Sequence, residues 1–429
     1  MFGFANFLLL ALFAAAVFDL IFALARGGGL RGALHGLWNT PHLLFGQQLA
    51  EWRLQLGRIL FAAGLAAYEI SVVFCNSMAR QNWAWVQGVM SPVLEWLAFL
   101  CFGAKILFGT RYTWRELLAG GALYFIARWV YFNSQNIWWI GIVVAVLAAK
   151  DVPLRRPLQV YFASGCAAMA VVLALHFAGI VAPDLTSERM GALRGTYGYG
   201  HPNTFGGLVF GLVLAYALLR AQKVRWVDCL LVFAVGVFLL VGPASRSAAL
   251  CTLALAVGLV FCLLRAGHSV PRWWPGTCAG MVGLTAAVSY LLPLLVIKVG
   301  PWNNDIGPAW LAKLDSLLTC RISLTWMAYR LLDVKIAGQV FNWPTVDNSF
   351  AFALFQFGPV VAALLGILFA AALWGHAKQG RRVEVCCLFA MLAYAYMEVQ
   401  PFHLTTNPTA LLLCGAVFAQ TSARWQKIE

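Results

Sequence analysis

The chain has 429 residues, of which 62% are hydrophobic and only 11% are charged. A soluble chain of this length carries roughly a quarter charged residues, so a soluble globular protein is excluded. Many continuous apolar runs approach the ~20 residues that cross hydrocarbon, and because they do not alternate they exclude a β-barrel. The net charge of +14 is typical of basic cytoplasmic loops and of attraction to anionic headgroups, and it does not indicate nucleic-acid binding.

We therefore predict an all-α integral membrane protein, a single polytopic helical bundle over residues 1–429. One segment, 136–149, is short, and a tilted or re-entrant course stays open for it. About thirteen segments, within a range of 11–14, are apolar enough to be spans: 4–25, 58–75, 92–109, 116–132, 136–149, 157–182, 203–220, 226–242, 247–265, 278–298, 347–373, 383–399 and 405–420.

Lys and Arg concentrate in alternate loops, which places those loops in the cytoplasm. With an odd number of spans, the N-terminus lies outside and the C-terminus inside. The basic loops carry Arg26, Arg31, Arg53, Arg58, Lys105, Arg111, Arg115, Lys150, Arg155, Arg156, Arg220, Lys223, Arg225, Arg265, Arg272, Lys378, Arg381, Arg382, Arg424 and Lys427.

The longest segment outside the predicted spans, residues 299–346, is expected on the extracytoplasmic side. Within it, 308–318 and 321–332 have helical character, and apolar residues of the second segment repeat at near-helical spacing. That pattern is typical of a helix lying at the membrane interface. A loop of this length in a tightly connected bundle is usually functional.

A polar, glycine-rich run from Arg194 to Gly207 lies between two apolar segments on the same side. It contains Tyr199, whose ring could stack on a sugar face, and His201, a candidate for substrate contact or proton transfer that could instead cap the next span. Asn203 follows it. A span alone would not need such a run, so function is expected here.

Two further segments on the outer side carry candidate arginines. Arg246 begins a span among small residues, which allow close helix packing, so we expect it to face the bundle. Arg321 and Arg330 lie on the predicted outer-loop helix. Together with Arg194, Arg246 and Arg321 could bind a diphosphate through their planar guanidinium groups.

Asp347 opens the predicted span 347–373, and Asn348 follows it. An aspartate there could cap the helix, or it could act as a base, whereas Asn348 could orient a sugar hydroxyl. The 11 cysteines show no Cys-x-x-Cys pair and no His/Cys metal spacing, so we expect packing residues or free thiols and no metal site.

In order along the chain, three polar motifs resemble the O-antigen ligase and polymerase superfamily, in its Wzy-type polymerase branch. They are Arg194-x6-His-Pro-Asn-Thr-x-Gly206, Ser245-Arg-Ser-Ala-Ala-Leu250, and Asp347-Asn-Ser-Phe-x-x-x-Leu-x-x-x-Gly358. The segment from Arg321 to Tyr329 is similar to the arginine-containing helix of that family's outer loop. In the ligases a histidine stands where this chain has Asp347, which favours the polymerase.

The resemblance implies a GT-C-like fold and a bacterial polysaccharide polymerase in the cytoplasmic membrane, with its active site outside and no metal or other cofactor. An acceptor hydroxyl would attack an undecaprenyl-diphosphate-linked oligosaccharide with inversion. Asp347, His201 and Arg246 would be catalytic. The expected substrate-binding residues are Arg194, Arg321, Asn203, Asn348, Tyr199 and Arg330. The bilayer, a chain-length regulator and a flippase would be partners.

Two other functions stay open. One is ligase-type transfer of a finished glycan to another acceptor. The other is a non-enzymatic lipid-linked oligosaccharide flippase, which would also need a cationic, lipid-open cavity. A transporter usually has related halves or a path that is basic on both faces, and no internal repeat is visible in the sequence.

The predicted sidedness can be tested by labelling single cysteines introduced at Ser187 and Asn304. Both should react with an impermeant maleimide in intact cells, because the basic loops place the other face in the cytoplasm. Labelling that appears only after permeabilisation would reverse the orientation.

Overall fold

The computed structural model describes residues 2–27, 29–46, 50–181, 187–189, 192–296 and 307–418. It is 77% helical. The start of the predicted outer loop, the labelling position Asn304, and the basic residues Arg424 and Lys427 lie outside the described residues.

The α-helices are α1 (Phe2–Ala25), α2 (Gly29–Asn39), α3 (Ala50–Cys75), α4 (Ala79–Asn82), α5 (Ser91–Phe108), α6 (Trp114–Ser134), α7 (Ile137–Ala148), α8 (Arg155–Phe177), α9 (Pro202–Arg220), α10 (Trp226–Val241), α11 (Arg246–Leu264), α12 (Trp274–Leu291), α13 (Ala309–Leu317), α14 (Arg321–Leu331), α15 (Ser349–Phe352), α16 (Pro359–Lys378), α17 (Arg382–Met397) and α18 (Cys414–Val417). Short π-helices cover Val86–Met90 and Ala353–Phe357, and 3-10 helices cover Leu292–Leu295, Gln400–Phe402 and Pro408–Leu413. Two antiparallel strand pairs join β1 (His42–Leu43) to β2 (Arg111–Tyr112) and β3 (Ser187–Arg189) to β4 (Ala192–Arg194).

Eight helices of the described chain are long and apolar enough to cross a membrane, as expected for an all-α membrane bundle. Their surface agrees with this, because α1 exposes 63% of Phe7, 68% of Leu10 and 71% of Phe13, which water would disfavour. The eight segments are Asn6–Ala25, Ala50–Cys75, Val86–Phe108, Arg155–Phe177, Pro202–Arg220, Arg246–Leu264, Trp274–Leu295 and Pro359–Lys378.

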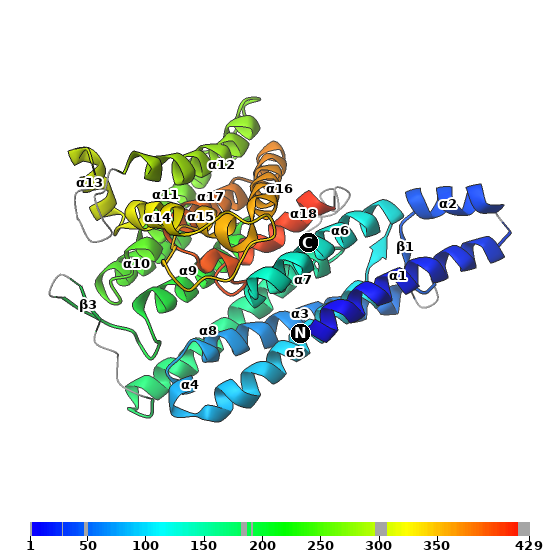
Figure 1. Ribbon diagram of the computed structural model, residues 1–429, viewed down its shortest axis with the longest axis horizontal. Helices are drawn as coiled ribbons and strands as arrows, with labels where there is room; N and C mark the ends of the chain where they lie inside the picture. The colour runs from blue at the N-terminus through cyan, green and yellow to red at the C-terminus, as the bar shows by residue number, and fades with distance from the viewer. Residues whose placement is uncertain are drawn as a thin grey trace.

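The two halves of the chain occupy two sides of the molecule (Figure 1). Helices α1, α3 and α5 of the N-terminal half run close together, and α3 also packs against α8. Helices α9 to α17 form the other side, where α11 contacts α10 and α17, and α12 contacts α16. The α8–α9 contact joins the halves. Most residues of α9 are buried, so this helix lies in the interior of the bundle.

The predicted single span 347–373 is wrong, because the chain breaks in its middle. The π-helix Ala353–Phe357 ends at Gly358, whose φ is 86°, and α16 starts at Pro359. Proline lacks an N–H and disfavours helical geometry in the residue before it. The predicted span 405–420 is also different, since its described part is a 3-10 helix followed by the short α18.

Both helices predicted in the outer loop are present as α13 and α14. The apolar stripe of α14, however, packs against the protein rather than lying free at an interface. Ile322 is 1% exposed and clusters with Leu311, and the Tyr329 ring contacts Phe355 at 5.4 Å between centroids. The apolar face of α14, which the sequence pattern assigned to the membrane interface, is therefore packed against other parts of the protein.

Two glycines of α9 allow the segment after α17 to approach this helix closely. A Cβ at Gly207 would collide with the side-chain amide of Gln400. A Cβ at Gly211 would lie 2.5 Å from the carbonyl oxygen of Thr405 and 2.9 Å from Cα of Thr406. Small residues let helices and loops pack this closely in membrane bundles, so α9 and the segment after α17 are held together.

We expect Gly211→Ala to destabilise the protein by about 1–3 kcal/mol, since backbone atoms cannot move away as a side chain can. The readout is the apparent melting temperature of the detergent-purified protein. Gly283→Ala in α12, where a Cβ meets open space, is the control and should be neutral or stabilising. Equal melting temperatures of the two variants would contradict this account.

Candidate functional site

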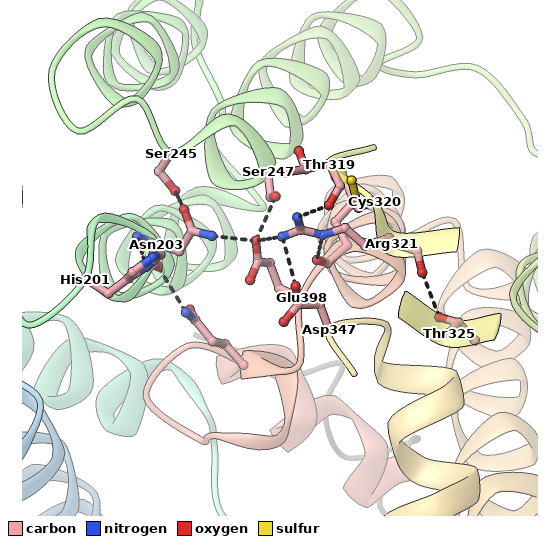
Figure 2. Close-up of polar contacts among 12 residues, drawn as sticks. His201, Asn203, Ser245, Ser247, Thr319, Cys320, Arg321, Thr325, Asp347 and Glu398 are labelled. Atoms are coloured by element: carbon pink, nitrogen blue, oxygen red, sulfur yellow. Dashed lines mark hydrogen bonds and ion pairs between the residues drawn. The ribbon is translucent and has the colours of Figure 1, made fainter. Parts of the chain in front are cut away.

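Five segments that are distant in sequence meet at one end of the bundle (Figure 2). They are the beginnings of α9, α11 and α14, the turn before α15, and the end of α17. Each of the four polar motifs contributes a side chain to this cluster, namely Asn203, Ser247, Arg321 and Asp347. The segment after α17 supplies Glu398, the partner that Asn203, Ser247 and Arg321 share.

A buried ion pair lies at the centre. Nη2 of Arg321, the first residue of α14, donates to Oε1 of Glu398 at 2.8 Å, and the two side chains are 8% and 6% exposed. Nε of Arg321 donates to the carbonyl of Met397 at 2.9 Å, and Nη1 to that of Thr319 at 3.1 Å. Most of the guanidinium is therefore used to join α14 to the end of α17.

The same carboxylate oxygen has two further donors. The Ser247 hydroxyl on α11 donates to Oε1 of Glu398 at 2.8 Å, and Nδ2 of Asn203 on α9 donates at 3.0 Å. Hydrogen bonds to an ionised acceptor are stronger than those between neutral groups. One oxygen atom thus connects three helices to the end of α17.

The charge of Glu398 depends on its neighbours. This residue lies just beyond the end of α17, and burial outweighs the effect of its partners, so that its pKa is raised to about 7. Without Arg321 and the hydrogen bond from Ser247 the pKa would be higher still, whereas Asp347 adds to the rise. The arginine is therefore the main group that favours the ionised form of this buried carboxyl.

Asp347 is the more accessible acid. Its Oδ2 lies 3.6 Å from Nη2 of Arg321, and its side chain is 26% exposed. It does not cap the following helix, because Oδ1 of Asn348 accepts from Phe350 N at 2.9 Å and Ala351 N at 3.1 Å. Asp347 is therefore available to a ligand, whereas Asn348 is buried in its capping role and does not reach a sugar hydroxyl in this conformation.

A second arginine joins the network through Asn203. Nη2 of Arg194, at the end of β4, donates to Oδ1 of Asn203 at 2.9 Å and to the carbonyl of Ala244 at 3.2 Å. Nε2 of Gln400 donates to the Asn203 carbonyl at 3.1 Å. Arg194 is only 7% exposed, so both Arg194 and Arg321 organise the site more than they present a free guanidinium.

Two predicted residues lie at its accessible edge. Arg246 is exposed at the start of α11, between Ser245 and Ser247, and the expectation that it faces the bundle interior is wrong. The helix instead turns the two flanking serines inward. His201 is exposed, and its Nδ1 accepts from Asn203 N at 3.1 Å, so it caps α9.

Two predicted residues are not part of the cluster. Tyr199 is fully buried and packs against Phe205, with 5.6 Å between ring centroids, so no face is free for a sugar. Arg330 lies over Trp326, at 5.8 Å from the ring centroid. Nine positions after Arg321, at about 100° per residue, it is on the opposite side of α14.

Glu398 is the residue that sequence reasoning did not include among the candidates. Its signal was an acid at the end of the apolar segment 383–399, followed by Gln400. An ionisable residue at membrane depth is a candidate by default, but the sequence alone does not show that Arg321 pairs with it.

Comparison of the chain with models of known protein families, with curated proteins and with solved structures found no match.

Breaking the central pair should destabilise the protein strongly. Arg321→Met leaves the Glu398 carboxylate buried without its cation, at a cost of about 3–5 kcal/mol. Arg330→Met on the same helix removes an exposed arginine, worth about 0.5–1 kcal/mol, and is the matched control. Thermal unfolding in detergent should separate the two variants clearly, and a shared melting temperature would mean that the pair contributes little.

Proposed function

We propose that this protein is a bacterial envelope polysaccharide polymerase, a glycosyltransferase that joins lipid-diphosphate-linked oligosaccharide units at the outer face of the cytoplasmic membrane. The observation that carries the proposal is a half-buried carboxylate, Asp347, held beside the Arg321–Glu398 pair at one end of a membrane bundle. An exposed cation, Arg246, lies at the start of the neighbouring helix α11.

In the proposed reaction, an acceptor hydroxyl attacks the anomeric carbon of the donor sugar. The new glycosidic bond forms as the bond from that carbon to the phosphate oxygen breaks, with inversion, and the lipid diphosphate leaves. Asp347 takes the hydroxyl proton. In the described part of the chain, Asn348 rather than Asp347 accepts the backbone N–H groups at the start of α15, and such bonds would weaken a carboxylate as a base.

The leaving diphosphate needs positive charge. Arg246 is the arginine that a ligand can reach directly, through a fork that suits phosphate oxygens. Arg321 and Arg194 are committed to Glu398 and Asn203, so their contribution is the local field and the position of Asp347. Preorganised charge of this kind stabilises a developing anion without reorganisation.

An apolar cavity of about 720 Å³ adjoins the cluster and suits the lipid part of such a donor. Ser349 connects the two, because it lines the cavity and donates through its hydroxyl to the Glu398 carbonyl at 2.6 Å. The remaining wall is largely aromatic and aliphatic and includes Trp139, Phe350, Leu365, Phe369 and Phe402.

Two alternatives concern the fate of the glycan. Ligase-type transfer would use the same site with a different acceptor. A flippase would need a polar path through the bundle, and basic residues do line cavities at the opposite end of α9. Between the two ends, however, α9 is packed by fully buried Phe210, Leu214 and Ala215, which favours a transferase. A chain-length regulator and a flippase would be its partners.

The test is chain extension by purified protein in proteoliposomes supplied with undecaprenyl-diphosphate-linked oligosaccharide. Asp347→Asn should lose at least about a hundredfold in rate, as general bases do, and His201→Ala should lose less. Arg246→Ala should be inactive and Arg246→Lys only weakly active. Asp333→Asn, an exposed acid of the same loop, is the control and should extend chains normally.

Each failure has a separate meaning. Normal extension by Asp347→Asn would remove the proposed base. Transfer of the donor glycan to a different acceptor, without lengthening, would identify a ligase. Movement of the lipid-linked oligosaccharide across the bilayer without any new glycosidic bond would identify a transporter.

A further inference from the structure

A second charged region lies at the far end of the same helices. The polar cluster is at the start of α9 and the end of α17, whereas this region is at the end of α9 and the start of α17. A helix of 19 residues, the length of α9, spans about 28 Å. Two adjoining cavities, of about 730 and 1020 Å³, share Ala221, Gln222, Arg381 and Glu384.

Five basic side chains line these cavities, and two of them are held by the protein. Arg220 pairs with Asp228, with Nε to Oδ1 at 3.0 Å, and Arg382 donates from Nη1 to the Arg265 carbonyl at 2.7 Å. The other three, Arg155, Lys223 and Arg381, have no carboxylate within 4.0 Å in the described part of the chain. They come from three different elements.

The acid that lines both cavities, Glu384, does not balance these cations. It makes no ion pair within the described residues. One acid therefore shares the cavities with three cations, Arg155, Lys223 and Arg381. Convergence of several cations without matched acids costs electrostatic repulsion, which an anionic ligand would relieve. Arginine and lysine side chains together are typical of phosphate recognition.

The other residues that line the smaller cavity are largely apolar and include a buried imidazole. His376 on α16 is 9% exposed, and its Nδ1 has no hydrogen-bond partner among the residues that the structure describes. Buried polar atoms are normally satisfied, so this one is a position for a ligand oxygen. The apolar wall consists of Leu154, Leu158, Leu218, Leu219 and Leu412.

We infer that these cavities bind an anionic, phosphate-bearing ligand, with the phosphate among Arg155, Lys223, Arg381 and His376. The leucine wall suits an adjoining acyl chain, as in an anionic phospholipid, although a soluble phosphate compound shares the headgroup chemistry. Basic pockets between membrane helices bind lipid headgroups in this way. The site is separate from the Asp347 cluster and does not depend on the proposed polymerase reaction.

The experiment measures binding to the full-length protein in detergent by native mass spectrometry, with phosphatidylglycerol, phosphatidylcholine, glycerol 3-phosphate and inorganic phosphate as probes. Phosphatidylglycerol should bind well above phosphatidylcholine. In the double variant Arg155→Gln/Arg381→Gln, the dissociation constant of phosphatidylglycerol should rise at least about tenfold. The reason is that losing a charge-assisted contact weakens binding by about tenfold or more. The matched control is Arg156→Gln/Arg272→Gln, which removes two exposed cations outside the cavities.

The single variants Lys223→Gln and His376→Gln keep the test decisive if the double variant does not fold, and each should weaken binding several-fold. Binding of glycerol 3-phosphate or phosphate as tight as that of the lipid, and lost in the same variants, would identify a soluble ligand for the site. Equal binding of phosphatidylglycerol and phosphatidylcholine, or unchanged binding in every cavity variant, would overturn the inference.

Discussion

The arrangement of the candidate site depends on one buried ion pair, Arg321 with Glu398. Removing two charges from water is costly, and the cost is offset only when every donor and acceptor around the pair has good geometry. Here the compensation comes from Ser247, Asn203 and the carbonyl of Met397. The pair therefore specifies how α9, α11 and α14 meet the end of α17, and it leaves Asp347 as the accessible carboxylate beside a fixed cation.

The interior helix α9 connects two regions of different character. At its start, matched charges and hydrogen bonds hold a carboxylate next to an apolar cavity, an arrangement suited to chemistry on a lipid-linked substrate. At its end, unmatched cations surround cavities with a leucine wall, an arrangement suited to binding an anion. Because α9 is packed along its length and approached closely at Gly207 and Gly211, the two regions are held at a defined separation.

Much of the fold could be predicted from local patterns. Apolar runs long enough for a bilayer identified helical segments, and the periodicity of residues 308–332 identified α13 and α14, since both signals depend on neighbouring residues alone. The prediction was wrong at Gly358-Pro359, where it ignored the break that proline introduces. It also assigned the apolar stripe of α14 to lipid, because a sequence pattern shows that a face is apolar but not what covers it.

By itself, the sequence determined that the chain is an apolar helical bundle and that Arg194, Asn203, Arg321 and Asp347 are polar exceptions, which lie in the segments between predicted spans or at the start of a span. Only the tertiary structure decided their roles. It paired Arg321 with Glu398, assigned helix capping to Asn348 instead of Asp347, buried Tyr199 and exposed Arg246. The physical reason is that hydrophobicity and helical period are properties of consecutive residues, whereas ion pairing, capping and exposure depend on which distant segments come within hydrogen-bonding distance.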